Sequence, residues 1–278
     1  MSRTLRLVWQ DRRARVGLAL VVLFALLAAF ASVVASHDPT AQLDLVGKQY
    51  QPPSLAHPFG TDFYSRDLLS RVLHGARISL SIAVLSVAVS IVLGTAVGLA
   101  AGLAGGLVDQ VLMRGVDGAL AMPRLFLVLV VVALWEDIGV VGLVLILGLT
   151  SWFDTSRIVR AEVLSVKSRQ FIAAARAVGL GLRGIVGRHL LPNIAGPIIV
   201  MATLGIGQMI LLEAGLSYLG VGVRPPTPSW GQIIADGQQV LRTAPWVALF
   251  PGLAIVVTVL AFSLLGDGVR RALDPRSQ

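Results

Sequence analysis

Long apolar stretches alternate with shorter polar stretches along the chain of 278 residues. A helix that crosses a membrane needs about 20 consecutive apolar residues. The stretches that approach or exceed this length are 16–36, 78–108, 114–135, 138–153, 190–212 and 243–266. The third and fourth are the least regular, because the third contains Asp117 and Arg124 and the fourth is short. The pattern predicts an all-α polytopic membrane protein with six transmembrane helices.

The first apolar stretch has two interpretations. It follows a basic segment and is followed by small residues, as in a cleaved secretory signal peptide. Its apolar run is longer than the 7–15 residues that are usual in signal peptides. We therefore expect 16–36 to be a retained anchor helix.

Composition supports the membrane assignment and narrows the chemistry. Hydrophobic residues make up 55% of the chain and charged residues only 14%, whereas soluble domains are about 25% charged. There is no cysteine, which excludes disulfides and thiolate metal sites. The histidines are scattered without ligand spacing, so we expect no metal site. The net charge is +8, but the basic residues do not form a patch interleaved with aromatic residues, as in a nucleic-acid surface. We therefore expect no nucleic-acid partner.

The positive charges predict the orientation. Lysine and arginine concentrate before the first span, in 154–192 and at the carboxyl end, and they are sparser in 37–75 and 217–242. Cytoplasmic loops carry the excess of positive charge. We therefore predict cytoplasmic tails at 1–15 and 268–278, an anchor at 16–36, an extracytoplasmic segment at 37–75, and a five-helix domain at 76–267. Within that domain, 154–192 is predicted to be cytoplasmic and 217–242 extracytoplasmic.

Catalytic motifs are absent from the sequence. No G-x-x-x-x-G-K-[ST], H-E-x-x-H or G-x-S-x-G occurs, and these are the patterns of phosphate-binding loops, zinc proteases and serine hydrolases. We expect no catalytic residue, and no ATP hydrolysis by this chain through a phosphate-binding loop.

Several intramembrane residues are candidates for packing or transport. Gly94, Gly98 and Gly102 recur every four residues, and such a smooth face lets another helix approach closely, either within this chain or from a partner subunit. Asp117 and Arg124 are two turns apart, so they are expected to share one face of the third span. Ionisable residues at membrane depth are costly and often functional, so either structural pairing or a path-lining role is open. Glu213 ends the fifth span, where a solvated boundary position is expected.

The basic connector between the fourth and fifth spans predicts a short amphipathic helix. Phe171, Ala174, Ala175 and Val178 follow the i, i+3, i+4, i+7 spacing of a helical face. Gly179 is placed to end that helix, and the glycines at 181, 184 and 187 are expected to loosen the chain before Pro192. Such a helix docks either on lipid headgroups or in a groove of another protein.

At these residues the chain resembles the permease subunits of bacterial ABC importers, in the dipeptide/oligopeptide/nickel group and its shorter permease type. The family has a cytoplasmic motif, EAA-x-x-x-G followed by nine residues and I-x-L-P. Ala174, Ala175, Gly179, Leu191 and Pro192 match it, whereas Ala173 replaces the Glu and His189 the Ile. The blocks 57–80, 213–231 and 266–276 also resemble the family, with Arg271 in place of the usual acid.

The resemblance implies the type I importer fold, an inner-membrane location and a set of partners. These are a second, similar permease, two ATPases that use ATP and Mg, an extracytoplasmic solute-binding protein and lipid. It also implies that this chain binds no cofactor, and that residues around Phe171, Arg176 and Gly179 contact an ATPase. The expected substrate is a di- or oligopeptide, with nickel or another small solute as the alternative. A secondary transporter or channel is the competing class.

Overall fold

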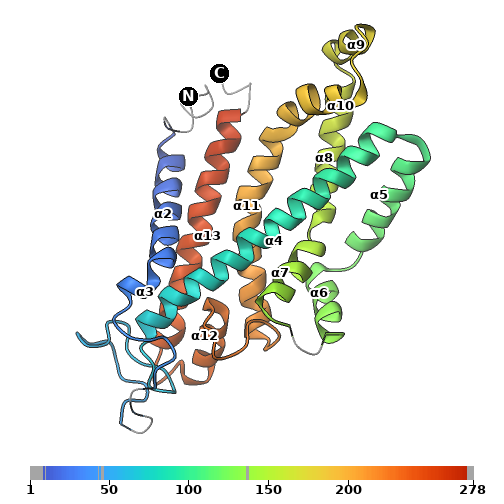
Figure 1. Cartoon of the computed structure of the whole chain (residues 1–278). Coiled ribbons are helices and arrows are strands. Elements are labelled where there is room, and N and C mark those ends of the chain that lie inside the picture. The colour runs from blue at the N-terminus through green and yellow to red at the C-terminus, as the bar shows by residue number, and fades with distance from the viewer. Residues whose placement is uncertain (1–8, 10, 43, 45–46, 136–137, 274–278) are drawn as a thin grey trace.

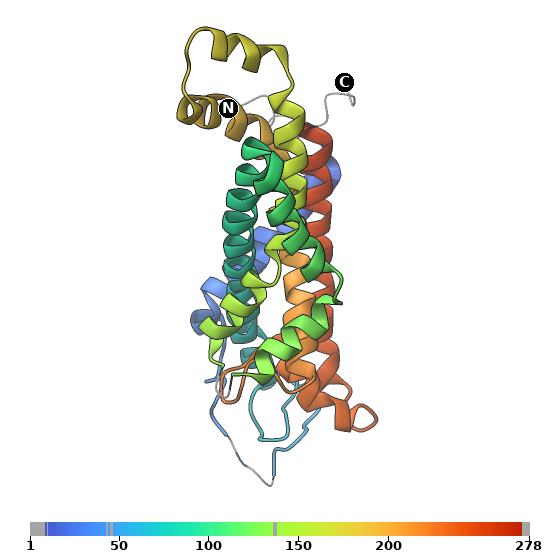
Figure 2. The ribbon, with the colours of Figure 1, turned by 90° about the vertical axis from the view of Figure 1, so that its right-hand side faces the viewer.

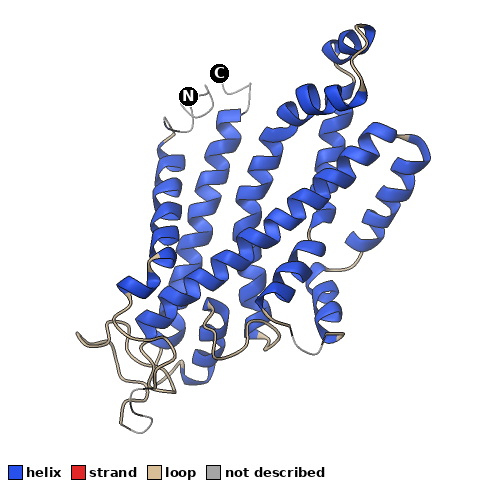
Figure 3. Cartoon of the chain, in the orientation of Figure 1, coloured by secondary structure: helices blue, strands red, loops and turns tan. Residues whose placement is uncertain are grey.

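The computed structural model describes residues 9, 11–42, 44, 47–135 and 138–273. Residues 1–8 of the predicted amino-terminal tail and 274–278 of the predicted carboxyl-terminal tail lie outside the described residues. The described chain is helical throughout its regular structure, with no strand (Figure 3). The predicted all-helical class is therefore confirmed.

The helices follow the apolar stretches with breaks that the sequence pattern only partly indicates. In chain order they are α2 Arg12–Ala29, α3 Ala31–Val34, α4 Leu68–Ala104, α5 Gly106–Leu120, α6 Arg124–Ala133, α7 Val140–Leu149, α8 Trp152–Lys167, α9 Gln170–Ala177, α10 Leu182–Ile185, a π-helical turn Val186–Leu190, α11 Leu191–Tyr218, α12 Trp230–Gly237, a 3-10 turn Gln238–Val240 and α13 Trp246–Leu273.

By length and composition, three of the described helices can cross a membrane: α4, the continuous helix Leu182–Tyr218, and α13. Two further spans are counted if each bent pair is one span. The pair α5 and α6 is bent by 86°, and the pair α7 and α8 by 40°. The helix α2 falls outside this count, since three arginines lie in its first turn. The described residues thus support three to five spans.

The bundle has two ends that differ in character (Figures 1 and 2). The start of α2, the end of α13 and α9 lie at one end, called here the α9 end. The loop between α3 and α4, together with α12, lies at the opposite end, called here the α12 end. The long helix α4 runs obliquely across the bundle and packs mainly against α8, α11 and α7. The helix α2 packs mainly against α13.

Two helix ends differ from the expected spans. The second span begins at Leu68, ten residues before the predicted start, because the Asp67 carboxylate accepts a hydrogen bond from the Ser70 amide (2.8 Å) and caps the helix. The helix α8 continues the fourth span to Lys167 instead of ending at residue 153. Its charges are accommodated by α4 and α5: Arg160 pairs with Asp109 (2.6 Å), and Lys167 Nζ donates to the carbonyl of Leu103 (2.8 Å).

Candidate functional site

The connector helix α9 projects from the end of the bundle and is held by a single buried side chain. Ile172 is 1% exposed and packs in a cluster with α8 residues such as Val163. Ile172 is not part of the predicted apolar face, whose residues are less covered: Phe171 is 37% exposed and Val178 89% exposed, Ala174 is exposed and Ala175 is half-buried. The predicted helix is therefore confirmed, and most of its apolar surface is left uncovered by this chain.

Gly179 ends α9 in the manner that the sequence predicts. Its φ of +84° lies in the left-handed region, where glycine carries no Cβ penalty. The Gly179 amide donates to the carbonyl of Arg176 (2.9 Å), and the Leu180 amide donates to that of Ala175 (3.0 Å). These two bonds form a Schellman motif, which satisfies the last carbonyls of the helix. Arg176, in the last turn of α9, is exposed and favourably placed for the helix dipole.

The segment after Gly179 differs from its prediction. Residues 182–190 are helical and run into α11 without a loosened stretch, because Ile185 and Leu190 are buried against the α8 cluster and tertiary burial overrides the weak helix propensity of glycine. Leu191 and Pro192 lie at the start of α11, and both are exposed. Ala173, at the position where Glu was expected, is also exposed.

Gly94, Gly98 and Gly102 form the face on which α8 packs. A Cβ at Gly94 would lie 2.5 Å from the Thr155 side chain, and one at Gly102 would lie 2.7 Å from that of Val163. These contacts are too short for any side chain larger than hydrogen. The stripe therefore serves packing within this chain, which is the first of its two predicted roles.

Asp117 and Arg124 do not share a helix face, which corrects the sequence-based expectation. Asp117 is in the last turn of α5, and Arg124 begins α6 beyond an 86° bend. Pro123, the residue before α6, removes a backbone donor and interrupts the helix at this point. Asp117 pairs instead with Arg157 of α8 (2.9 Å), with both side chains more than half exposed.

Arg124 enters an open cavity of about 350 Å³ between α4, the α7–α8 bend and α11. Its guanidinium donates to the hydroxyl of Ser151 and lies 3.2 Å from the sulfur of Met209. Its Nε atom is buried with no hydrogen-bond partner. Other polar lining residues are Ser90, Asp154, Thr155 and Gln208. The cavity thus combines apolar walls with a cation at the point where two spans are broken.

Glu213 is buried, with 1% of its surface exposed, so the expectation of a solvated boundary residue is wrong. Its carboxylate accepts hydrogen bonds from Ser79 of α4 (3.0 Å) and Ser217 of α11 (2.8 Å). The helix α12 covers it, since the Trp230 amide donates to the hydroxyl of Ser79 (3.2 Å). Glu213 therefore joins three helices near the α12 end.

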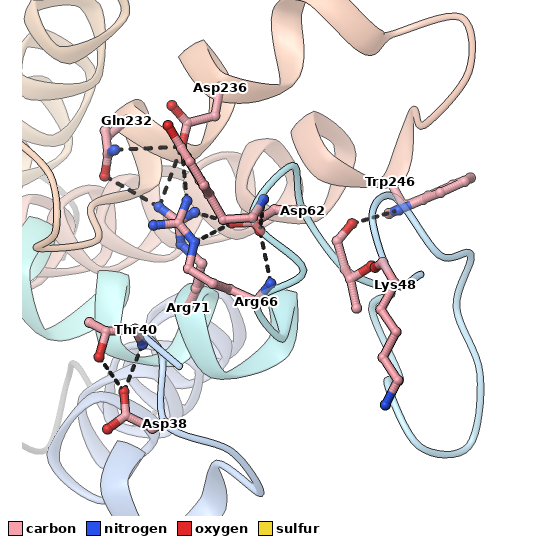
Figure 4. Close-up of polar contacts among 11 residues, drawn as sticks. Asp38, Thr40, Lys48, Asp62, Arg66, Arg71, Gln232, Asp236 and Trp246 are labelled. Carbon is pink, nitrogen blue, oxygen red and sulfur yellow. Dashed lines mark hydrogen bonds and ion pairs between the residues drawn. The ribbon is translucent and has the colours of Figure 1, made fainter. Parts of the chain in front are cut away.

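A second polar network at the α12 end joins the α3–α4 loop, α4 and α12 (Figure 4). The carboxylate of Asp62 accepts hydrogen bonds from Arg66 Nε (2.7 Å) and from Arg71, which is fully buried. The guanidinium of Arg71 also lies 3.4 Å from Asp236 of α12. Burial raises the pKa of the Asp236 carboxyl, and Arg71 and Arg66 oppose that rise. The sequence reasoning did not single out these residues, although Asp62 and Arg66 stand four apart within the block 57–80.

Taken together, the long apolar helices, the cavity at two broken spans and the projecting helix α9 define a polytopic membrane component with one uncovered helix at one end. Comparison with known proteins identifies its family. Residues 94–278 match the family described as "binding-protein-dependent transport system inner membrane component". Residues 2–53 match the "N-terminal TM domain of oligopeptide transport permease C".

Individual relatives agree with these matches. The oligopeptide transport system permease protein OppC of Escherichia coli strain K12 is 41% identical over 98% of this chain and 93% of its own length. The dipeptide transport system permease protein DppC of Alkalihalophilus pseudofirmus is 38% identical over 96% of this chain and 87% of its own length. The chain belongs to the family of inner membrane components of binding-protein-dependent transport systems. The predicted resemblance is confirmed, and so is the role of a membrane component in transport.

Proposed function

We propose that the chain is the non-catalytic permease subunit of an ATP-driven importer of di- or oligopeptides. It forms half of the translocation path, with a second, similar permease supplying the other half. The relatives described above are named for oligopeptides and dipeptides, which favours peptides over nickel as the substrate.

The exposed face of α9 carries the coupling assignment. A helix that is anchored by one buried isoleucine and leaves Phe171 and Val178 uncovered fits the helix-in-groove mode of recognition. We assign its partner as a cytoplasmic ATPase, which binds ATP with Mg and moves α9 as it closes. This assignment places the α9 end and both tails in the cytoplasm. A solute-binding protein then meets the α12 end outside.

Single cysteines test both the docking and the orientation, because the natural chain contains none. Val178→Cys carries the probe on the residue that follows α9, which is 89% exposed, and Leu55→Cys, in the α3–α4 loop, is the matched control at the α12 end. We expect Val178→Cys to crosslink to the co-expressed ATPase and Leu55→Cys not to do so. In spheroplasts, an impermeant maleimide should label Leu55→Cys directly but Val178→Cys only after permeabilisation. The reverse labelling pattern would overturn the orientation.

The substrate is tested separately by reconstituting the complete transporter with its solute-binding protein in proteoliposomes. We expect ATP-dependent accumulation of a labelled dipeptide or short oligopeptide, with unlabelled peptide as competitor. Accumulation of nickel that peptides do not compete against would contradict the peptide assignment while leaving the coupling assignment intact.

A further inference from the structure

Two histidines and an aspartate that are distant in sequence converge at the α12 end. His37 follows α3, His57 lies in the α3–α4 loop, and Asp67 caps α4. His57 Nδ1 lies 2.9 Å and His37 Nδ1 4.0 Å from the same carboxylate oxygen, Oδ1 of Asp67. The two imidazole rings are 4.9 Å apart. One ligand atom from each residue lies within 4.8 Å of the others.

The burial of this cluster suits a bound ion better than a solvated surface group. Asp67 is completely buried and His57 is 5% exposed, while the side chain of His37 is 30% exposed and gives access from solvent. A buried carboxylate that faces two imidazoles offers the nitrogen and oxygen ligands that zinc and neighbouring divalent metals prefer.

Hydrogen bonds to Ser70 hold Asp67 and His37 in place. The second carboxylate oxygen of Asp67 accepts from the Ser70 amide (2.8 Å), and the His37 amide donates to the Ser70 hydroxyl (3.3 Å). Ser70 thus positions both the carboxylate of Asp67 and the backbone of His37, and such outer partners are a usual part of metal sites. The hydroxyl of Ser36 lies 2.9 Å from His37 Nδ1, so the ion must displace this contact when it binds.

We propose that His37, His57 and Asp67 bind one divalent transition-metal ion, with a fourth position open to water. Tetrahedral zinc holds its nitrogen and oxygen ligands about 3.3 Å apart. The two distances to Asp67 Oδ1, 2.9 and 4.0 Å, bracket this value, and all three ligand atoms lie within 4.8 Å of one another. Side-chain rotations that bring the two imidazoles closer together complete the geometry. On binding, the proton that His57 Nδ1 shares with Asp67 moves to Nε2 or to solvent, because the ligating nitrogen must be free. The ion then ties the end of the first helical segment to the start of α4.

Binding is measured on the full-length chain in detergent, without a histidine tag and after treatment with a chelator. We expect one equivalent of Zn²⁺ by isothermal titration, and visible bands typical of a four-coordinate site with Co²⁺. His37→Ala should weaken Zn²⁺ binding at least tenfold. His74→Ala is the control, because His74 lies outside the cluster and contacts the Ser70 carbonyl. The His74→Ala variant should bind Zn²⁺ with the same affinity as the natural chain.

Asp67→Asn supplies a second variant, since asparagine is also a good N-cap but is a poor metal ligand. It should retain the fold and lose Co²⁺ binding. Equal Zn²⁺ affinity in the natural chain and in His37→Ala, or no stoichiometric binding in the natural chain, would overturn the proposal. The cluster would then be a hydrogen-bonded helix cap only. The measurement requires neither transport nor an ATPase, so it stands apart from the proposed function.

Discussion

Gly98 of α4 lies directly against the backbone of α8, so that a Cβ built on Gly98 would be 2.6 Å from the carbonyl oxygen of Ser156. Backbone cannot move away as a flexible side chain can, and extra atoms in a packed interface cost about 1–3 kcal/mol. We expect Gly98→Val to lower the midpoint of thermal unfolding in detergent by several degrees.

Gly118→Ala is the matched control for this packing effect. Gly118 is also helical, in α5, but a Cβ there meets nothing within 4 Å. Alanine favours helix by about 1 kcal/mol over glycine. The unfolding midpoint of Gly118→Ala should therefore equal that of the natural chain or lie slightly above it. Equal midpoints for Gly98→Val and the natural chain would rule out tight packing at this stripe.

The proposed coupling helix makes a sharp prediction about where a negative charge is tolerated. Ala175 is half-buried on α9 and Ala173 is exposed, and Ala173 is the position at which the resemblance in the sequence analysis leads us to expect Glu. We expect Ala175→Glu and Gly179→Glu to abolish peptide uptake while membrane insertion stays normal. Ala175→Glu places a charge in the proposed docking surface. Gly179→Glu places a side chain at a left-handed backbone position that only glycine adopts readily.

Ala173→Glu introduces the same charge two residues from Ala175 and should preserve uptake. Uptake and membrane content are both measured, so a lost signal can be assigned to coupling. Normal uptake with Ala175→Glu would count against α9 as the docking element.

The buried network around Asp62 should be among the most sensitive positions in the protein. Asp62→Ala removes the carboxylate that Arg66 and Arg71 share, and breaking a buried pair in this way costs about 3–5 kcal/mol. Asp38→Ala is the control, because its carboxylate is exposed and bonds only locally, to Thr40 (2.6 Å). Both carboxylates and their contacts are drawn in Figure 4. The midpoint of thermal unfolding should fall strongly for Asp62→Ala and only slightly for Asp38→Ala.

The contacts of Asp11 at the α9 end make the stability of the fold depend on pH. Its Oδ1 caps α2 by accepting from the Arg13 amide (2.8 Å), and its Oδ2 accepts from Arg271 Nε of α13 (2.7 Å). The hydrogen bond from Arg271 is the main reason that the pKa of this carboxyl is lowered. A lowered pKa stabilises the fold above the ordinary aspartate pKa of about 4, and this contribution is lost as the pH falls through the folded-state value.

Two variants separate the roles of Asp11. Asp11→Asn keeps a capping oxygen and loses the ion pair, while Asp11→Ala loses both and should cost about 1 kcal/mol more. Thermal unfolding between about pH 3 and pH 7 should show the difference between the natural chain and Asp11→Asn shrinking at the acid end. A difference that is constant over this range would contradict the ion pair.

Substitution of Arg124 decides between the two roles that the sequence leaves open for this residue, structural pairing and lining a transport path. Arg124→Met keeps an unbranched side chain but removes the only cation lining that cavity among the described residues. If Arg124 contacts an anionic group of a peptide in transit, uptake should fall at least tenfold with unchanged insertion. Arg157→Met is the control, since Arg157 is half-exposed and pairs outside the cavity. Equal uptake in both variants would assign Arg124 to structure alone.

Local sequence patterns were enough to predict the positions of several helices. The features that they did not predict depend on contacts between residues that are distant in the sequence. Apolar length located α4, α11 and α13, and the spacing around Ala174 with Gly179 located α9 and its end. The charges of α8 suggested that the fourth helix ends at residue 153, but the helix continues to Lys167, and Arg160 pairs with Asp109, 51 residues away. Nor could local spacing bring His37 to Asp67 or bury Glu213 beneath α12, because those environments exist only after the helices pack.

The pairing of α2 with α13 constrains how the protein is made. Asp11 and Arg271 are 260 residues apart, so α2 finds its main partner only after the residues of α13 have been synthesised. Until then, the surface of α2 that packs against α13 is uncovered. Truncation before α13 would therefore leave α2 without its main contact.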